Sequence, residues 1–304
     1  MQQYNIGIPQ ALLFHEFGSL WREFFKKLDI PVTLSGETNK GILDRGTALA
    51  IDESCLPLKV YLGHVDKLLP QCSHIFVPRI AQYHRNFHFC AKFAGLPDII
   101  SNTFGVSPER LLAPNVENQT PLNRIQAVNS ICRGLGISPL AGQAAYHHAV
   151  KAWRSQISLK NGYSSQKIGL VGHNYLVRDS FFCRDIIKTL QSQGATIITP
   201  DDLPGKMLYE EAQIFVPDLY WQLSAKLAGA ARYFCRQSGI QGIMLVSSFG
   251  CGPDSLVNEY LEHHILQPSK KPYIVINLDE HTGSAGIITR VEAFWDLVNR
   301  RALA

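Results

Sequence analysis

Three of the seven cysteines in this chain lie in turns where a thiol could bind a metal or attack an electrophile. Cys251 stands between Gly250 and Gly252, in the turn that follows the apolar run 243–246, and this run predicts a buried strand. The glycines let the backbone bend and approach a ligand, and Pro253 suits the first position of a helix whose dipole would favour the thiolate. The open alternative is a buried, inert cysteine.

Cys55 and Cys90 share this setting. Cys55 precedes a helical pattern with Pro57 near its first turn, and Cys90 lies in a loop beyond the strand predicted at 74–80. Three thiolates converging from two domains would suit an iron-sulfur cluster with one open iron, whereas a structural zinc would normally want a fourth protein ligand. The other four, Cys72, Cys132, Cys183 and Cys235, are interpreted as core or incidental cysteines.

A second polar group follows the strand predicted at 272–278. Glu280 and His281 are candidates for proton transfer, and Asp279 is a candidate for cofactor contact together with Gly250 and Gly252. A purely structural hydrogen-bonding role for His281 stays open.

The elements that must position these residues alternate between short apolar runs and helical patterns. This alternation predicts an α/β fold with two doubly wound, Rossmann-like or flavodoxin-like parallel sheets. The expected organisation is a first α/β domain at 1–120, a helical connection at 121–164 and a second α/β domain at 165–304. A cleft between strand ends of the two domains would be the natural place for a shared site.

The composition and charge argue against some classes of function. The 304 residues are 46% hydrophobic and 18% charged, which is typical of a globular protein, and the net charge of +4 includes no basic run that would favour nucleic acid. No apolar run reaches the ~20 residues that cross a bilayer, and no signal peptide is evident, so we expect a cytoplasmic protein without membrane contact. No CxxC pair and no phosphate-binding nucleotide loop occur; Gly169 and Gly172 alone are a weak signal.

Several motifs resemble those of the 2-hydroxyacyl-CoA dehydratase superfamily, and most closely its branch of activase-related, uncharacterised proteins. They are IPQALLF at 8–14, DESCLPLK at 52–59, FVPR at 76–79, CAKFAGLPD at 90–98, the segment 247–255, LDEHT at 278–282 and TRVEAF at 289–294. The resemblance runs from near residue 5 to near residue 298. It implies two Rossmann-like domains per subunit and cysteine ligands for an iron-sulfur cluster, which would here be Cys55, Cys90 and Cys251.

The chain also departs from that family. Only three cysteines match motif positions, which favours a 4Fe-4S cluster over a double cubane, and Ala91 stands where a proline is expected after Cys90. The resemblance implies an ATP-hydrolysing activator protein as partner, an acyl-CoA substrate and a homo- or hetero-oligomer.

Two functions are therefore expected as alternatives. The first is an iron-sulfur redox protein that accepts low-potential electrons from the activator for a difficult reduction or a radical dehydration of an acyl-CoA. The second is a non-catalytic partner or scaffold subunit that carries a cluster or zinc.

Overall fold

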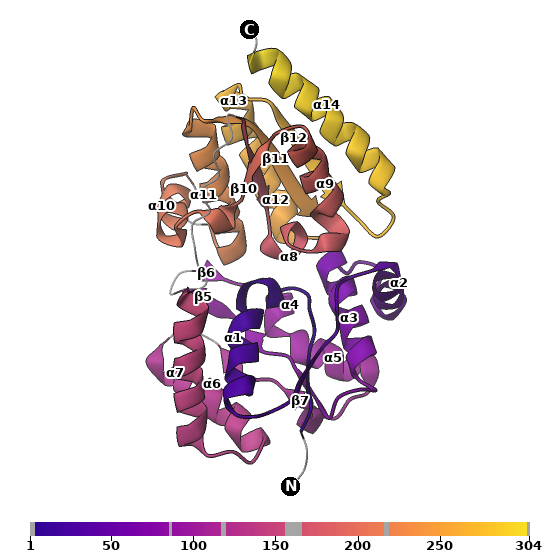
Figure 1. The fold of residues 1–304 in the computed structure, drawn as a ribbon, viewed down its shortest axis with the longest axis vertical. Coiled ribbons are helices and arrows are strands. Elements are labelled where there is room, and N and C mark those ends of the chain that lie inside the picture. The colour runs from indigo at the N-terminus through magenta and orange to yellow at the C-terminus, as the bar shows by residue number, and fades with distance from the viewer. Residues whose placement is uncertain (1–3, 85–86, 117–119, 156–165, 216–218, 303–304) are drawn as a thin grey trace. The chain divides into compact units, whose positions relative to one another are not determined.

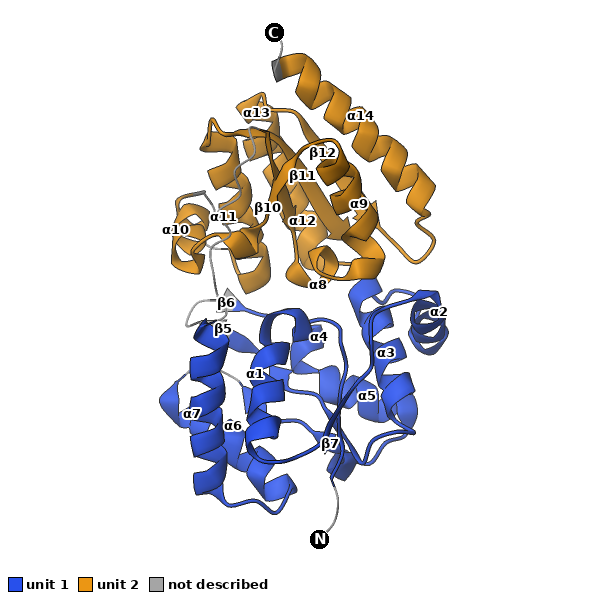
Figure 2. Cartoon of the chain, in the orientation of Figure 1, with its two compact units in different colours: residues 1–158 blue, residues 159–304 orange. Residues whose placement is uncertain are grey.

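The chain forms two compact units in a computed structural model, residues 1–158 and 159–304 (Figure 2). The structure describes residues 4–84, 87–116, 120–155, 166–215 and 219–302. Within these ranges, no helix has the length and apolar character needed to cross a membrane.

The first unit is built on a parallel sheet of four strands in the order β2-β1-β3-β7. Its strands are β1 (Ile6–Ile8), β2 (Val32–Leu34), β3 (His74–Phe76) and β7 (Leu111–Leu112). Beyond β3 and β7 the chain pairs again as β4 (Arg79–Ile80) with β8 (Asn115–Val116), and β5 (Gln82–His84) forms an antiparallel pair with β6 (Phe87–His88).

Seven helices surround this sheet in the described part of the first unit. They are α1 (Phe14–Lys27), α2 (Lys40–Leu49), α3 (Leu56–Leu68), α4 (Ala91–Ala94), α5 (Leu96–Phe104), α6 (Pro121–Gly134) and α7 (Pro139–Ser155). Their starts follow from local chemistry: the Asn39 side chain accepts a hydrogen bond from the Ile42 amide at 3.1 Å at α2, and Thr120 accepts from the Asn123 amide at 3.2 Å at α6.

The helices α6 and α7 fall in the segment expected to be a connection between domains. Val128, Ile131 and Ala149 pack in one buried cluster with Ile6 and Phe24 of the first unit. An apolar helix face is stabilised by burial against a sheet, so α6 and α7 contribute to the core of this unit.

The second unit repeats the plan with a parallel sheet in the order β10-β9-β11-β12. Its strands are β9 (Lys167–Gly172), β10 (Thr196–Ile198), β11 (Ile240–Ser248) and β12 (Tyr273–Leu278). The helices are α8 (Asn174–Val177), α9 (Ser180–Ser192), α10 (Gly205–Phe215), α11 (Gln222–Arg236), α12 (Gly252–Leu261), α13 (Gln267–Ser269) and α14 (Ser284–Ala302), with α14 lying along α9 (Figure 1).

Both sheets therefore have the strand order 2-1-3-4 when strands are counted along each unit, which confirms the predicted α/β class with two doubly wound parallel sheets. In such a sheet the chain direction of the connections reverses between the first and third strands, and ligands bind beyond the carboxyl ends of those two strands. This switch point lies between β1 and β3 in the first unit and between β9 and β11 in the second.

Two local features depend on particular residues and contacts. The chain from β7 to β8 is interrupted at Pro114, which has no amide hydrogen for the ladder. The helix α10 was not expected from the sequence; it packs against α11.

Candidate metal centre

The turn after β9 brings a histidine to the switch point of the second unit. His173 follows Gly172 directly and is the N-cap residue of α8. A Cβ atom at Gly172 would lie 2.9 Å from Val177 Cγ2 and 3.0 Å from Val246 O, so only glycine lets the two strands and the turn approach this closely. The ring of His173 stacks on Tyr175, with centroids 4.8 Å apart.

The turn after β11 supplies two more groups. Cys251 is the N-cap residue of α12, and Asp254 lies in the first turn of that helix. Gly250 has a φ of 76°, a left-handed conformation that favours glycine, and it turns the chain from the strand into the helix. Val246 of β11 pairs with Gly172 of β9, so both turns leave the same edge of the sheet.

These three residues form one compact group. The Nε2 atom of His173 lies 2.7 Å from Oδ1 of Asp254, and the side chains are 4% and 2% exposed. A ligand atom from each of His173, Cys251 and Asp254 lies within 4.8 Å of the other two, and Cys251 is half-buried. An imidazole, a thiol and a carboxylate in this arrangement can hold a metal ion.

The second carboxylate oxygen of Asp254 is available to bind a ligand. Within the described chain, Asp254 Oδ2 is buried and has no hydrogen-bond partner, and the same is true of Ser248 Oγ at the end of β11. Burying an unpaired carboxylate oxygen is costly, and buried carboxylates are normally paired or bound to metal. A cation between Asp254 and Cys251 would satisfy this oxygen, so the donor set fits a metal.

The donor types favour zinc or a similar transition metal. In a tetrahedral zinc centre the ligand atoms lie about 2.0–2.3 Å from the ion and therefore roughly 3.5 Å from one another. On binding, the 2.7 Å distance between His173 Nε2 and Asp254 Oδ1 would increase slightly. The widest separation between ligand atoms of the three residues, up to 4.8 Å, would decrease by about 1 Å. Three protein ligands leave one coordination position for water or a small molecule.

The other two predicted ligands belong to the first unit, while Cys251 belongs to the second. Cys55 is the N-cap residue of α3, Cys90 is the N-cap residue of α4, and both are half-buried. Burial raises the pKa of the Cys90 thiol, the amides of Lys92 and Phe93 lower it, and the neighbouring Cys55 raises it again. The structure thus brings Cys55 and Cys90 near each other, so a metal bound there would displace a proton from Cys90.

The remaining cysteines lie apart from these turns. Cys72, Cys132 and Cys183 are buried, and burial raises the pKa of Cys183 to about 12. Cys235 is half-buried, and its thiol lies 3.8 Å from the carbonyl oxygen of Ile265.

The residues 279–281 form a turn after β12, the neighbour of β11. Asp279 accepts hydrogen bonds from the Thr282 hydroxyl at 2.6 Å and from the His281 amide at 2.9 Å, and these bonds, the Thr282 one foremost, lower its pKa. Glu280 is half-buried, and the His281 side chain is exposed. Asp279 therefore stabilises the turn, and the proposed proton-transfer roles of Glu280 and His281 stay predictions.

Sequence reasoning did not identify His173 or Asp254 as candidate ligands. The available signal was that His173 stands beside a glycine directly after an apolar run, and that Cys251 also stands beside a glycine in a turn after a strand. His173 is a neighbour of Cys251 and Asp254 because β9 pairs with β11. The local periodicity of a sequence does not predict the order of strands in a sheet.

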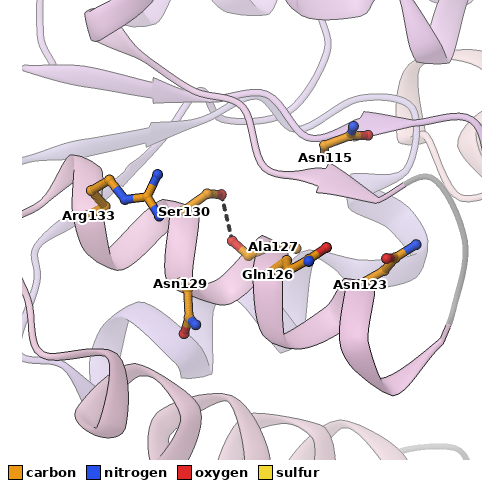
Figure 3. Close-up of a pocket in the computed structure, with 7 residues that line it drawn as sticks. All are labelled: Asn115, Asn123, Gln126, Ala127, Asn129, Ser130 and Arg133. Atoms are coloured by element: carbon orange, nitrogen blue, oxygen red, sulfur yellow. Dashed lines mark hydrogen bonds between the residues drawn. The ribbon is translucent and has the colours of Figure 1, made fainter.

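A separate cavity of about 340 Å³ lies over α6 in the first unit (Figure 3). Its polar side chains do not converge: Asn129 points away from Asn115 and accepts a hydrogen bond from Gln143 at 2.9 Å, and Ser130 donates to the carbonyl oxygen of Ala127 at 2.8 Å. Its arrangement differs from that of the buried group around Asp254.

Fold and site together define a two-unit α/β protein with a His-Cys-Asp group, two of its three residues buried, at the switch point of its second sheet. Residues 5–203 match the family model described as the CoA enzyme activase uncharacterised domain (DUF2229), which is well over half of the chain. The chain belongs to this family. No curated protein matches it.

This family corrects the function expected from the sequence. The family is described by activation of a CoA enzyme and not by the reaction of that enzyme. The expected iron-sulfur dehydratase-like protein, which accepts low-potential electrons for reduction or radical dehydration of an acyl-CoA, is therefore wrong. The alternative of a cluster- or zinc-carrying scaffold subunit gains no support from the family. The activase part of the resemblance is confirmed.

Proposed function

We propose that this chain is a metal-binding component of a system that activates a CoA-dependent enzyme. The metal, zinc or a related divalent ion, would be held by His173, Cys251 and Asp254. The observation that carries this proposal is the buried Asp254 carboxylate, which contacts His173 through one oxygen and leaves the other without a partner in the described chain. Family membership supplies the context of CoA-enzyme activation.

The metal would act through its open coordination position. A divalent ion there polarises a bound oxygen or binds a thiolate, and it lowers the pKa of a bound water. The pairing with His173 fixes the Asp254 carboxylate, and Gly250 and Gly252 keep the turn open to a bulky ligand. Glu280 and His281 follow the next strand of the same sheet and are proposed to move protons beside it, with Asp279 fixing their turn.

The proposed partners are an ATP-hydrolysing activase module and a CoA-dependent enzyme of the kind that the dehydratase-like motifs suggest. The chain has no phosphate-binding nucleotide loop, so nucleotide hydrolysis is assigned to the separate module. The metal-loaded chain would then take part, with the activase module, in activating the enzyme. The cytoplasm is the proposed location.

Cys55 and Cys90 are also proposed as metal ligands. They are proposed to bind a second metal or, together with Cys251, a 4Fe-4S cluster. Metal analysis separates these occupants, because a cluster contains iron and sulfide in about equal amounts whereas a mononuclear centre contains one metal and no sulfide.

The test is anaerobic purification of the full chain, metal analysis, and titration of the metal-free protein with Zn²⁺ or with Co²⁺, whose thiolate charge-transfer absorption reports a sulfur ligand. The expected result is one ion per chain, with affinity lowered about 100-fold or more in His173→Ala, Cys251→Ser or Asp254→Asn. Cys183→Ser is the matched control, because its thiol is buried elsewhere in the same unit.

The outcome that overturns the proposal is a His173→Ala, Cys251→Ser, Asp254→Asn triple variant that binds Zn²⁺ as tightly as the unaltered chain. Iron with equal sulfide, lost also in Cys55→Ser and Cys90→Ser, would replace the mononuclear centre by the cluster. The activation role is tested by adding the metal-loaded or the metal-free chain to the activase module and its CoA-dependent enzyme; equal activation by both would refute it.

A further inference from the structure

The first unit carries an apolar groove beyond the carboxyl ends of its strands. Ile80 of β4 and Val116 of β8 line it together with residues of α1, α6 and α7. Its volume is about 100 Å³, and it shares Phe17, Trp21 and Ile80 with a second apolar cavity of about 40 Å³. The groove thus lies on the ligand-binding side of a doubly wound sheet.

Aromatic rings give the groove a fixed shape. The indole of Trp153 donates a hydrogen bond to the carbonyl oxygen of Glu16 at 3.1 Å, and its ring lies 5.7 Å from that of Phe17, measured between centroids. Trp21 packs on Phe76 at 4.7 Å and on Tyr146 at 6.1 Å. Rigid aromatic walls of this kind bind the face or edge of an apolar ligand at low entropic cost.

Two arginines give the groove positive charge. Arg124 and Arg154 line it together with Tyr146. Burial raises the pKa of the Tyr146 phenol, and the two arginine charges lower it. Among the residues that the structure describes, neither Arg124 nor Arg154 forms an ion pair with a carboxylate. A guanidinium group can bind a carboxylate bidentately, and a phenol in the same lining can donate a further hydrogen bond.

We infer that this groove binds a small carboxylate with an apolar body, placing the body between Trp21 and Trp153 and the carboxylate at Arg124, Tyr146 and Arg154. An apolar cavity of 150 Å³ accommodates benzene, so a groove of about 100 Å³ that shares three wall residues with a cavity of about 40 Å³ suits one six-membered ring or a short aliphatic chain. The positive charge selects a carboxylate over the corresponding amide. This inference concerns the first unit and does not rest on the proposed metal centre.

The test uses phenylacetate as the probe and the fluorescence of the tryptophans as the signal, in the full chain. Trp221→Phe and Trp295→Phe remove the two tryptophans of the second unit, so the remaining signal comes from Trp21 and Trp153. We expect saturable quenching by phenylacetate and at least tenfold weaker binding of phenylacetamide, which has the same shape without the charge.

Substitutions of single arginines test which positive charges bind the carboxylate. Arg124→Gln is expected to weaken phenylacetate binding about tenfold, because it removes a charge-assisted hydrogen bond. Arg154→Gln is expected to weaken it about threefold, because that side chain is more exposed. Arg133→Gln is the matched control on α6, since Arg133 is also exposed but lies outside the groove, and it should leave the affinity unchanged.

Equal affinity for phenylacetate and phenylacetamide, or an Arg124→Gln, Arg154→Gln double variant that binds like the unaltered chain, would overturn the inference. A flat titration together with a change of oligomeric state in the double variant would also overturn it, because the groove would then be an interface between copies of the chain. Thermal unfolding of each variant checks that the first unit is folded.

Discussion

The two units have the same strand order but place opposite chemistry at the same topological position. Beyond β9 and β11 the second unit buries a polar group, His173 and Asp254, beside Cys251. Beyond β1 and β3 the first unit has Ile8 and Phe76 around an apolar cavity. The common sheet thus fixes where a ligand binds, and the residues that follow the strands decide what kind of ligand it is.

The largest difference between the units should appear when metal is added. At a free Zn²⁺ concentration 1,000 times the dissociation constant, an ion that binds only the folded protein stabilises it by about 4 kcal/mol. We expect this stabilisation as slower amide hydrogen exchange in β9, β11 and β12, with little change in β1 and β3. Cys251→Ser should abolish the effect and Cys183→Ser should retain it; protection spread equally over both units would contradict the contrast.

Packing at the apolar switch point gives the next largest effect. Ile8 is 4% exposed and borders the cavity, so Ile8→Ala should lower the free energy of unfolding of the first unit by about 3 kcal/mol. Ile168 of β9 is fully buried in the second unit and serves as the matched position, where Ile168→Ala should cost about as much or more. Urea unfolding measures both, and a cost below about 1 kcal/mol for Ile8→Ala would mean that the cavity wall is loosely packed.

Sequence patterns were sufficient for the alternation of strands and helices and for the turn around Cys251. They identified this turn because a glycine-flanked residue after an apolar run has a local signature. The role of His173 depends on which strand pairs with β11, and the packing of α6 and α7 depends on which face finds a sheet to cover. These are tertiary contacts, so periodicity alone could not predict them.

The first unit also contains a buried histidine, His64, which should lower the free energy of unfolding of that unit as the pH falls. His64 is fully buried, with Nδ1 2.8 Å from Ser35 Oγ and Nε2 3.0 Å from Thr38 Oγ1. Burial, and then the charges of His15 and Lys67, lowers its pKa to about 3. In the unfolded chain histidine has a pKa near 6.5, so the unfolded state binds more protons between these values.

Stability from His64 is therefore fully present above about pH 6.5 and is lost as the pH falls toward 3. Between pH 7 and pH 5 the loss should be about 2 kcal/mol. Urea midpoints at pH 7, 6 and 5, followed through Trp21 and Trp153, measure it. His64→Gln should lower stability at pH 7 and flatten the pH dependence; an unchanged slope in that variant would assign the acid sensitivity to other groups.

The smallest expected effect tests whether buried polar groups at the switch point of the second unit lower the free energy of unfolding of the metal-free protein. Ser247 and Ser248 are adjacent at the end of β11 and are 5% and 4% exposed. The Ser247 hydroxyl donates to Asn277 Oδ1 at 3.3 Å, whereas Ser248 Oγ has no partner in the described chain. Removing an unpaired buried hydroxyl relieves a desolvation cost, whereas removing a paired one loses a hydrogen bond.

In the metal-free protein, Ser248→Ala should raise the free energy of unfolding of the second unit by about 1 kcal/mol, and Ser247→Ala should lower it by about 0.5–1 kcal/mol. Urea unfolding of the two variants under identical conditions gives opposite shifts of the midpoint. Equal destabilisation by both substitutions would show that Ser248 is satisfied in solution, and the argument for a missing ligand would then rest on the Asp254 carboxylate alone. Opposite changes in the free energy of unfolding would indicate that this edge of the sheet binds a ligand. A buried hydroxyl without a partner lowers stability, and such a residue persists where function requires it.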